Sequence, residues 1–328
     1  MRILQIRGQG TPPDQVETTH RIAAVTVAGG QVRPLDPLSS QVGSTWRSAA
    51  KPLQLWCSLE ALSDPPELGP EWIALGASSH SGQHGHVEGV RAILRHFGLD
   101  EGQLQCGAEP PAHRPTSEAL LRGGDPFLAL HNDCSGKHSF MLAACRAQGW
   151  STADYLDPAH PLQRRILARA QDWCQEVPGV AVDGCGLPTL SLSLTGMARA
   201  WERLAVAQAQ PQQDPRLARI AQAMADHPWF TSGDQRIDLA LHRRATEPWI
   251  GKIGARGVFC FALPARGIGG ALKVLDGDED ALAVAVPAVV EHFAPGALKP
   301  DPDWPYAQIR NVVGRIVGTR VVREDDGV

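Results

Sequence analysis

The sequence predicts an α/β or α+β protein in which one mixed sheet is assembled from both ends of the chain. Apolar, β-branched segments lie near the N-terminus at 21–27 and near the C-terminus at 258–263 and 271–275. Helical patterns dominate the middle, from about residue 125 to residue 245. The chain has 328 residues, 43% of them hydrophobic, which is enough for a sizeable core. We therefore expect a sheet packed against a largely helical subdomain.

The expected strands can be taken in chain order. RIAAVTV at 21–27 is β-branched and apolar, which is typical of a strand. The short apolar run at 72–77 predicts a buried strand that leads into a loop rich in Ser, His and Gly. The segments 258–263 and 271–275 are joined by the Gly-rich ARGIGG and predict a hairpin. The tail at 311–322 predicts a last strand pair or an exposed end.

Helices are expected where apolar residues recur three and four positions apart, or where a start signal precedes them. Ser48 begins the first, in which Pro52 is tolerated only because it falls in the first turn. Pro161 begins another. The expected helices cover 48–62, 86–97, 138–148, 161–177, 217–225, 234–241 and 280–293, with one more from about residue 194.

Composition narrows the class of protein. The formal net charge is -4 and the basic residues are scattered, which argues against a nucleic-acid partner. No apolar run approaches the roughly eighteen residues of a membrane helix, and no signal peptide is visible at the N-terminus. The chain has 7 widely spaced cysteines, which suggests reduced thiols and a cytoplasmic protein.

Two serine motifs offer a nucleophile. Ser48 and Lys51 form an S-x-x-K; residues three apart share a helix face, so the lysine amine can reach the hydroxyl. A neutral lysine can take the serine proton if burial or a nearby cation lowers its pKa. The loop SSHSG follows the expected strand at 72–77, and there Ser79 competes with Ser78 and Ser81. The alternatives are a helix cap with a surface lysine, and a polar loop.

A second lysine lies in a Gly-rich segment, GKIGARG, ahead of an expected strand. Lysine is scarce in this chain, so a lysine between glycines draws attention. Lys252 facing the S-x-x-K pair would keep the site cationic and push one amine toward neutrality. The alternatives are an exposed lysine on a turn, and Lys273 in place of Lys252.

Two cysteine motifs suggest a metal. In NDCSGKH, Cys134 shares a helix face with Lys137 and His138, and a thiolate with a second soft or nitrogen ligand suits zinc. In DGCGLPT, Cys185 lies between glycines and could join Cys134, while Asp183 could hold a substrate ammonium. The alternatives are buried structural cysteines, a polar helix start and a tight turn.

Taken in order along the chain, these motifs resemble those of the asparaginase II family, the rhizobial-type thermolabile L-asparaginases. The combination of CSGKH with a distant DGCG is specific, and the matching segments run over nearly the whole chain. They are RSAAKPLQ (47–54), ASSHSG (77–82), the Cys-Gly-x-x-x-Pro of 106–111, HNDCSGKHSFML (131–142), DGCGLP (183–188), GKIGARGV (251–258) and ALKVLDGD (271–278).

The resemblance implies a fold like that of the serine β-lactamases and glutaminases, with residues 1–328 as a single domain in a homodimer. It implies two Ser–Lys pairs and a zinc ion held by two cysteines and a lysine. It also implies residues that bind L-asparagine. The assignments are Ser48 with Lys51 and Ser79 with Lys252 as the pairs, Cys134, Lys137 and Cys185 as zinc ligands, and Arg47 (α-carboxylate), Asp183 (ammonium) and His138 (pocket wall) as substrate-binding residues.

The expected reaction is hydrolysis of the side-chain amide of L-asparagine to L-aspartate and ammonia through a lysine-activated serine. Which serine attacks stays open, as does the role of the metal. Two other functions remain as alternatives. One is a serine hydrolase acting on another amide, such as glutamine or a β-lactam, although the K-T-G and S-D-N motifs of β-lactamases are absent. The other is a non-catalytic protein that binds zinc or an amino acid.

Overall fold

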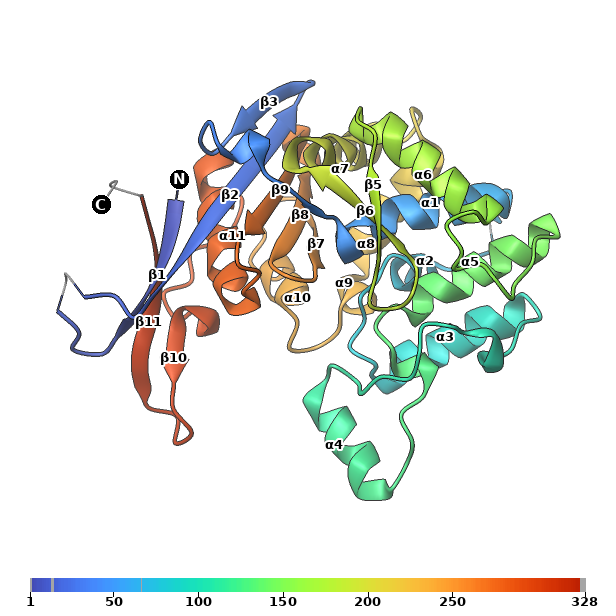
Figure 1. The fold of residues 1–328 in the computed structure, drawn as a ribbon, viewed down its shortest axis with the longest axis horizontal. Coiled ribbons are helices and arrows are strands. Elements are labelled where there is room, and N and C mark those ends of the chain that lie inside the picture. Colours follow the sequence, from blue (N-terminus) through green and yellow to red (C-terminus); the bar gives the residue numbers. More distant parts are fainter. Residues whose placement is uncertain (1, 13–14, 66, 325–328) are drawn as a thin grey trace.

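The main sheet joins strands from both ends of the chain, as the sequence predicts, but its described strands are all antiparallel and the predicted mixed sheet is wrong. The computed structural model describes residues 2–12, 15–65 and 67–324. Eight strands form one sheet in the order β10-β11-β1-β2-β9-β8-β7, with β3 paired to β2, and each neighbouring pair is antiparallel (Figure 1). The strands are β1 (Arg2–Gly8), β2 (Thr18–Ala28), β3 (Gln31–Pro34), β7 (Ile250–Gly254), β8 (Val258–Leu263), β9 (Ile268–Val274), β10 (Gln308–Arg310) and β11 (Ile316–Glu324).

Both faces of this sheet are covered. Along β2, Ala23 and Val25 point into the larger core beneath the helices, whereas Ile22 and Ala24 point into a second core beneath α11 (Glu279–Phe293). Helix α7 (Leu194–Ala209) packs on the first face, against β2, β8 and β9. Gly269 of β9 permits this contact, since a Cβ there would overlap the α7 backbone at Glu202.

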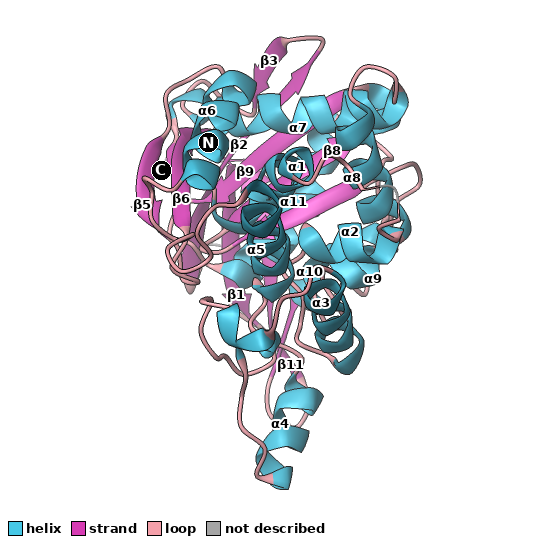
Figure 2. Ribbon diagram, turned by 90° about the vertical axis from the view of Figure 1, so that its right-hand side faces the viewer, coloured by secondary structure: helices cyan, strands magenta, loops and turns pink. Residues whose placement is uncertain are grey.

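The remaining helices form a layer beside the sheet, seen from the front in Figure 2. It extends further toward the N-terminus than the predicted range of 125–245, because four of its helices precede residue 125. The helices of this layer are α1 (Lys51–Ala61), α2 (Pro70–Gly76), α3 (His84–His96), α4 (Arg114–Gly123), α5 (Ser135–Gln148), α6 (Pro161–Cys174), α8 (Pro215–Asp226), α9 (Pro228–Thr231) and α10 (Ile237–His242).

The strand predicted at 72–77 is wrong, because this segment belongs to helix α2. Pro70 lies in its first turn together with Glu71, and both residue types favour a helix start. A six-residue apolar run has no period long enough to separate a buried strand from a buried helix. The Ser78–Ser81 loop therefore follows a helix C-terminus rather than the end of a strand.

A small second sheet brings distant segments to the site. It has the order β4-β6-β5, with β4 (Gly43–Thr45), β5 (Gly179–Val182) and β6 (Pro188–Ser193). Directly after β4, the Trp46 amide donates to the Leu190 carbonyl at 2.7 Å. The 3-10 segment η2 (Arg47–Ala50) follows, so Arg47 and Ser48 lie beside the loop between β5 and β6.

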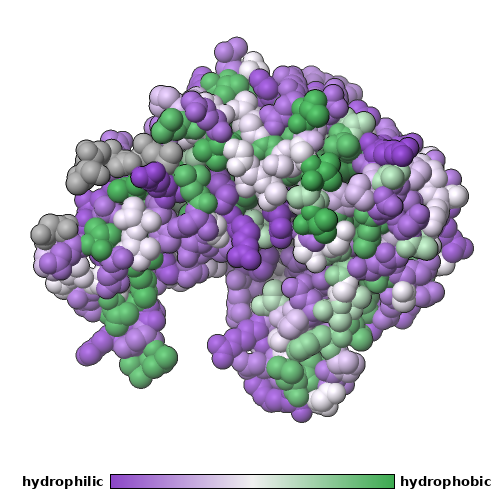
Figure 3. Space-filling model, in the orientation of Figure 1, coloured by the Kyte–Doolittle hydropathy of each residue, from purple (hydrophilic) through white to green (hydrophobic). Residues whose placement is uncertain are grey.

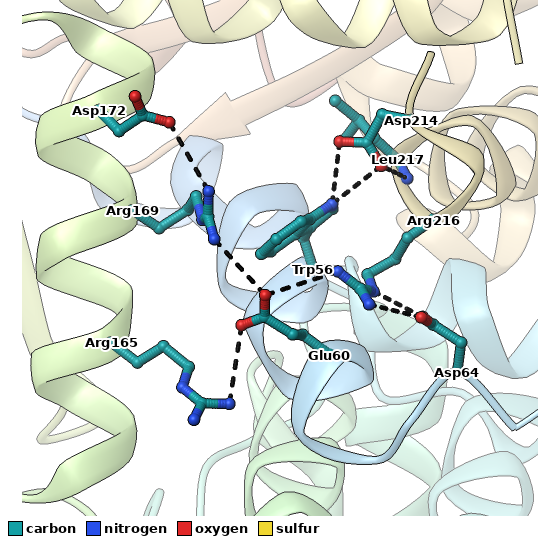
Figure 4. Close-up of polar contacts among 9 residues, drawn as sticks. All are labelled: Trp56, Glu60, Asp64, Arg165, Arg169, Asp172, Asp214, Arg216 and Leu217. Atoms are coloured by element: carbon teal, nitrogen blue, oxygen red, sulfur yellow. Dashed lines mark hydrogen bonds and ion pairs between the residues drawn. The ribbon is translucent and has the colours of Figure 1, made fainter. Parts of the chain in front are cut away.

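Helices α1, α6 and α8 are joined by a polar cluster around Trp56 and Glu60 (Figure 4). The guanidinium groups of Arg169 and Arg216 lie 4.2 and 4.3 Å from the Trp56 ring centroid. The same two arginines approach the Glu60 carboxylate at 3.4 and 3.9 Å. The Trp56 indole N–H donates to Asp214 at 3.1 Å. This cluster fixes α1, and with it the position of Lys51 at its first turn.

The surface is deeply notched between the projecting α4 and the sheet end that carries β10 and β11, as Figures 1 and 3 show. Helix α4 buries none of its residues, and its Leu121 side chain is exposed. In the part of the chain that the structure describes, none of the helices has the length and apolar character needed to cross a membrane. The single domain predicted for 1–328 stays a prediction.

Candidate active site

Lys51 is hydrogen-bonded to the loop that carries Ser79. Its Nζ atom lies 2.9 Å from Ser79 Oγ, 2.5 Å from the Ser78 carbonyl oxygen and 3.3 Å from the Asp133 carbonyl oxygen. The side chain is fully buried. Three acceptors match the three N–H bonds of an ammonium group. The structure therefore pairs Lys51 with Ser79, whereas the spacing predicted Ser48 as its partner. A lysine side chain is long enough to leave its own helix and reach the neighbouring loop.

Ser48 lies in η2, one turn before the start of α1. It is partly exposed, whereas Ser79 is 1% exposed. The preceding residue, Arg47, has φ 54°, in the left-handed region that non-glycine residues rarely adopt. Such backbone outliers gather at functional sites. Of the two predicted serines, Ser48 is the more accessible to a small molecule.

Lys252 is fully buried on β7, the last strand of the main sheet. Strand β7 packs against η2, the segment that carries Ser48. The Nζ atom donates to the Ile253 carbonyl at 3.1 Å, so the predicted bond to Ser79 is not formed. Burial lowers the pKa of the Lys252 amine to about 7; Asp238 opposes this shift, and the positive charge of Lys51 adds to it. Lys252 is thus a buried amine that can be neutral near pH 7.

Lys273, the alternative to Lys252, lies elsewhere. Its Nζ atom donates to the carbonyl oxygens of Arg256 and Val274 at 2.6 and 2.5 Å. Arg256 lies in the turn between β7 and β8. Burial lowers its pKa, and the nearby charge is Asp276 rather than Lys51. Between these two lysines, it is Lys252 that shares the site with Lys51.

Arg47 and Asp183 form an ion pair across the second sheet. The Arg47 Nε atom lies 3.0 Å from Asp183 Oδ1, although its N–H does not point at that oxygen. The Gly184 amide donates to the same carboxylate at 2.8 Å. The two groups predicted to bind an amino acid's charges are therefore adjacent and partly exposed.

The predicted metal ligands converge at the start of α5. Lys137 Nζ donates to Cys185 Sγ at 3.4 Å. The neighbouring Cys134 thiol and the charge of Lys137 hold the pKa of the Cys185 thiol well below its usual value, and the pKa of Cys134 is raised in turn. All three side chains are at most 5% exposed. Gly136 allows this packing, because a Cβ there would overlap the Leu75 carbonyl of α2.

His138 lies beside this cluster in the interior. Its Nδ1 atom is 2.7 Å from the Tyr155 hydroxyl, and its Nε2 atom is buried with no hydrogen-bond partner among the described residues. Burial lowers the pKa of the imidazole, and the Cys185 sulfur opposes that shift. His138 is therefore placed to contact whatever binds next to Cys185.

The sequence reasoning missed several charged groups at this site. Burial raises the pKa of the Asp133 carboxyl, but Lys51 and Arg236 outweigh it and hold that pKa well below its usual value. Arg236 and Asp238 flank the start of α10. Asp133 lies within the motif HNDCSGKH, so the sequence could have indicated it. No local pattern distinguishes Arg236 or Asp238 from surface residues.

His80 joins the serine loop to α5. Its Nδ1 atom accepts from the Gly82 amide at 3.1 Å, so its Nε2 atom carries the proton and donates to Ser135 Oγ at 2.8 Å. Burial holds the pKa of His80 well below its usual value. The neutral ring thus ties the Ser78–Ser81 loop to α5, the helix that begins within the motif NDCSGKH.

The donor set can be compared with what a metal requires. Within 2–12, 15–65 and 67–324, no three His, Cys, Asp or Glu side chains gather as a metal site. Two cysteines and one lysine gather instead, and thiolate and amine donors suit zinc. Burial lowers the pKa of Lys137, but the two cysteines outweigh it and raise that pKa, so a metal would have to displace the lysine proton. The three residues fit zinc in donor type and position.

Comparison with known proteins decides the family. The sequence profile described as L-asparaginase II matches residues 13–321. The chain belongs to the L-asparaginase II family. Membership in this family supports an asparaginase-type amidohydrolase that acts on a small-molecule amide. Among curated proteins, none matches the chain in sequence.

Solved structures show more distant likenesses. Mglu in its native form is 14% identical, with 86% of this chain and 66% of that chain covered and a TM-score of 0.46. Mglu in its tris and glutamate form is also 14% identical, with 89% and 62% covered and a TM-score of 0.46. A putative β-lactamase from Bacteroides dorei DSM 17855 is 15% identical, with 83% and 94% covered and a TM-score of 0.43. The chain thus spans less than two thirds of the length of these Mglu chains.

Proposed function

We propose that this family member hydrolyses the side-chain amide of L-asparagine to L-aspartate and ammonia. The proposal is carried by one observation: two buried lysines share a site with two serines, and one lysine, Lys51, donates to Ser79 at 2.9 Å. Lys51 has three oxygen atoms within hydrogen-bond distance, which occupy its amine and leave it no free face for the serine proton. Lys252, with a pKa of about 7, supplies the neutral amine that a serine nucleophile needs.

In this proposal Ser48 attacks, because it is the more exposed serine and its segment packs against β7. Lys252 takes the hydroxyl proton as the Ser48 oxygen bonds to the amide carbon. The carbon–nitrogen bond then breaks, and ammonia leaves with the proton that Lys252 held. Water adds to the resulting ester and releases aspartate and free Ser48. Lys51 and Ser79 supply positive charge and a hydrogen bond beside the developing oxyanion.

Arg47 and Asp183 would hold the substrate's main-chain charges. A free amino acid carries a carboxylate and an ammonium on one carbon, and an adjacent arginine and aspartate complement both. In the absence of substrate the two side chains neutralise each other. The predicted roles of Arg47 at the carboxylate, Asp183 at the ammonium and His138 in the pocket wall are kept in this proposal.

Zinc is part of the proposal. Zinc would be held by Cys134, Lys137 and Cys185. It would connect the start of α5 to the 183–187 loop beside the substrate and would supply positive charge there. A neutral Lys137 is required for this role. The homodimer implied by the family resemblance and the cytoplasmic location indicated by the cysteines stay predictions. A light-scattering measurement of mass in solution tests the dimer.

The test is ammonia release from L-asparagine by the purified protein, beside Ser48→Ala, Ser79→Ala and Ser81→Ala. We expect Ser48→Ala to reduce kcat by about 10⁴-fold or more, Ser79→Ala by about 10²–10³-fold, and Ser81→Ala to remain active. Release from glutamine but not asparagine would favour the other-amide alternative. Binding of asparagine without any ammonia release would favour the non-catalytic one.

A further inference from the structure

Asp238 is a buried carboxylate next to the proposed base. It lies in the first turn of α10 and is 5% exposed. Its Oδ1 atom accepts from the Ile253 amide at 2.7 Å, and its Oδ2 atom is buried without a hydrogen-bond partner in the described part of the chain. A carboxylate buried with a single N–H donor is costly unless a positive charge is close. The nearby buried charge on β7 is Lys252.

The bond from Asp238 also fixes the strand that carries Lys252. Strand β7 ends the main sheet and pairs with β8 along one edge, with Lys252 opposite Cys260. An edge strand leaves backbone N–H groups without a strand partner. Asp238 binds such a group, at the residue directly after Lys252, and Lys252 Nζ donates to the carbonyl of that same residue. One residue, Ile253, therefore connects the carboxylate to the amine.

The other charges that act on Lys252 come from three neighbouring segments. Two are cations, Lys51 on α1 and Arg236 directly before α10, and one further carboxylate, Asp133, precedes α5. Tyr306, from the segment after α11, is close enough for Asp238 and Arg236 to act on its pKa, which burial raises. When Lys252 gains a proton it adds a third positive charge. Asp238 is the carboxylate that lies near the Lys252 amine and also accepts a hydrogen bond from β7, the strand that carries this lysine.

We propose that Asp238 is a positioning residue of the serine–lysine site: it fixes β7 at Ile253 and stabilises the ammonium that forms when Lys252 takes the serine proton. The kinetic effect expected of Asp238 rests on the proposed function. Its effect on the proton affinity of Lys252 is independent of that function. The arrangement is comparable to the acid that orients and stabilises the base in a Ser-His-Asp triad.

The test measures Lys252 directly. The chain has only the lysines Lys51, Lys137, Lys252, Lys273 and Lys299, so their ¹³Cε signals can be separated in protein labelled at lysine, with Lys252→Met to assign one of them. In Asp238→Asn we expect the Lys252 titration midpoint to fall by about one unit, a tenfold loss of proton affinity. The acidic limb of kcat/KM should move with it, and kcat should fall.

Asp276→Asn is the matched control, since Asp276 faces Lys273 rather than Lys252. It should move the Lys273 signal and leave Lys252 unchanged. Arg236→Gln supplies a second variant of opposite sign, because loss of a nearby cation should raise the Lys252 midpoint. It keeps the idea testable if Asp238→Asn does not fold.

A Lys252 midpoint unchanged in folded Asp238→Asn would overturn the proposal, as would an unchanged midpoint in Arg236→Gln if the first variant does not fold. Failure of the proposed function looks different: wild type would release no ammonia from asparagine, yet its Lys252 signal would still titrate and still respond to Asp238→Asn.

Discussion

The guanidinium of Arg47 lies 3.0 Å from the carboxylate of Asp183. The two residues are 136 positions apart in the sequence, and they follow the ends of two different strands. The second sheet brings them together, because β4 leads into Arg47 and β5 leads into Asp183. Thr189 Oγ1 also accepts from the Arg47 amide, at 3.2 Å. A preformed pair of opposite charges beside a partly exposed serine is a suitable receptor for an amino acid.

Replacing Asp183 by Asn should therefore weaken binding of asparagine. The substrate ammonium would lose a charged partner, and Arg47 would keep its full charge with no acid beside it. A hydrogen bond to a charged group contributes about 1.5–3 kcal/mol, so KM should rise by roughly 10- to 100-fold. Steady-state ammonia release checks this, with the exposed Asp172→Asn as control. An unchanged KM in Asp183→Asn would remove this residue from the substrate site.

The activity should depend on pH through Lys252. Its amine acts only when neutral, and its pKa is lowered to about 7, first by burial and then by Lys51 and Arg236 against the opposing charge of Asp238. Below pH 7 the amine is protonated and inactive, so kcat/KM should rise about tenfold per pH unit on the acidic side and level off above pH 7. The measurement is kcat/KM for asparagine from pH 5 to 9. A profile that is flat between pH 5 and 8 would contradict a Lys252 base.

The helices and strands that could be predicted are those whose sequence pattern lies in consecutive residues. The β-branched run at 21–27 and the hairpin around ARGIGG reveal their strands locally, and all three strands lie in one sheet. The run at 72–77 is too short to show a period, and only Pro70 and Glu71 before it indicated helix α2. Local pattern thus specified long elements and failed for the short one.

The residues of the site could be predicted from the sequence better than the contacts between them. The motifs contain Ser79, Lys51 and Lys252, but the bond from Lys51 to Ser79 joins α1 to a loop 28 positions away. A spacing rule within one helix cannot anticipate a side chain that crosses to another element. Asp238 and Arg236 lie in a stretch with no unusual composition, and they come close to Lys252 only through the packing of α10 on β7.

Loss of Cys185 should remove the bound metal. If Cys134, Lys137 and Cys185 hold zinc, Cys185→Ser should lower the zinc content of purified protein from about one ion per chain to near zero, and the thermal stability gained from metal should disappear with it. Elemental analysis and thermal melts with and without a chelator measure both. Cys174→Ala, a buried cysteine at the end of α6, should keep its metal. Equal zinc content in the two variants would locate the metal elsewhere.

Trp56 should contribute strongly to stability because it links three helices. It is 7% exposed, lies between the guanidinium groups of Arg169 and Arg216, and donates to Asp214 (Figure 4). Trp56→Ala leaves a large cavity and should lower the free energy of unfolding by about 3–5 kcal/mol. Chemical denaturation measures this, with Leu121→Ala as the control at an exposed position, where a change within about 0.5 kcal/mol is expected.

The same variant connects stability to the site. Trp56 lies on α1 five residues beyond Lys51, and Glu60 on the same helix also contacts Arg169 of α6 and Arg216 of α8 (Figure 4). Loosening α1 should therefore disturb the Lys51–Ser79 bond before the sheet is affected. We expect Trp56→Ala to lose ammonia release at a lower denaturant concentration than it loses the far-ultraviolet signal of its secondary structure. Coincident loss of both signals would mean that α1 and the sheet unfold as one unit and that the cluster acts on global stability alone.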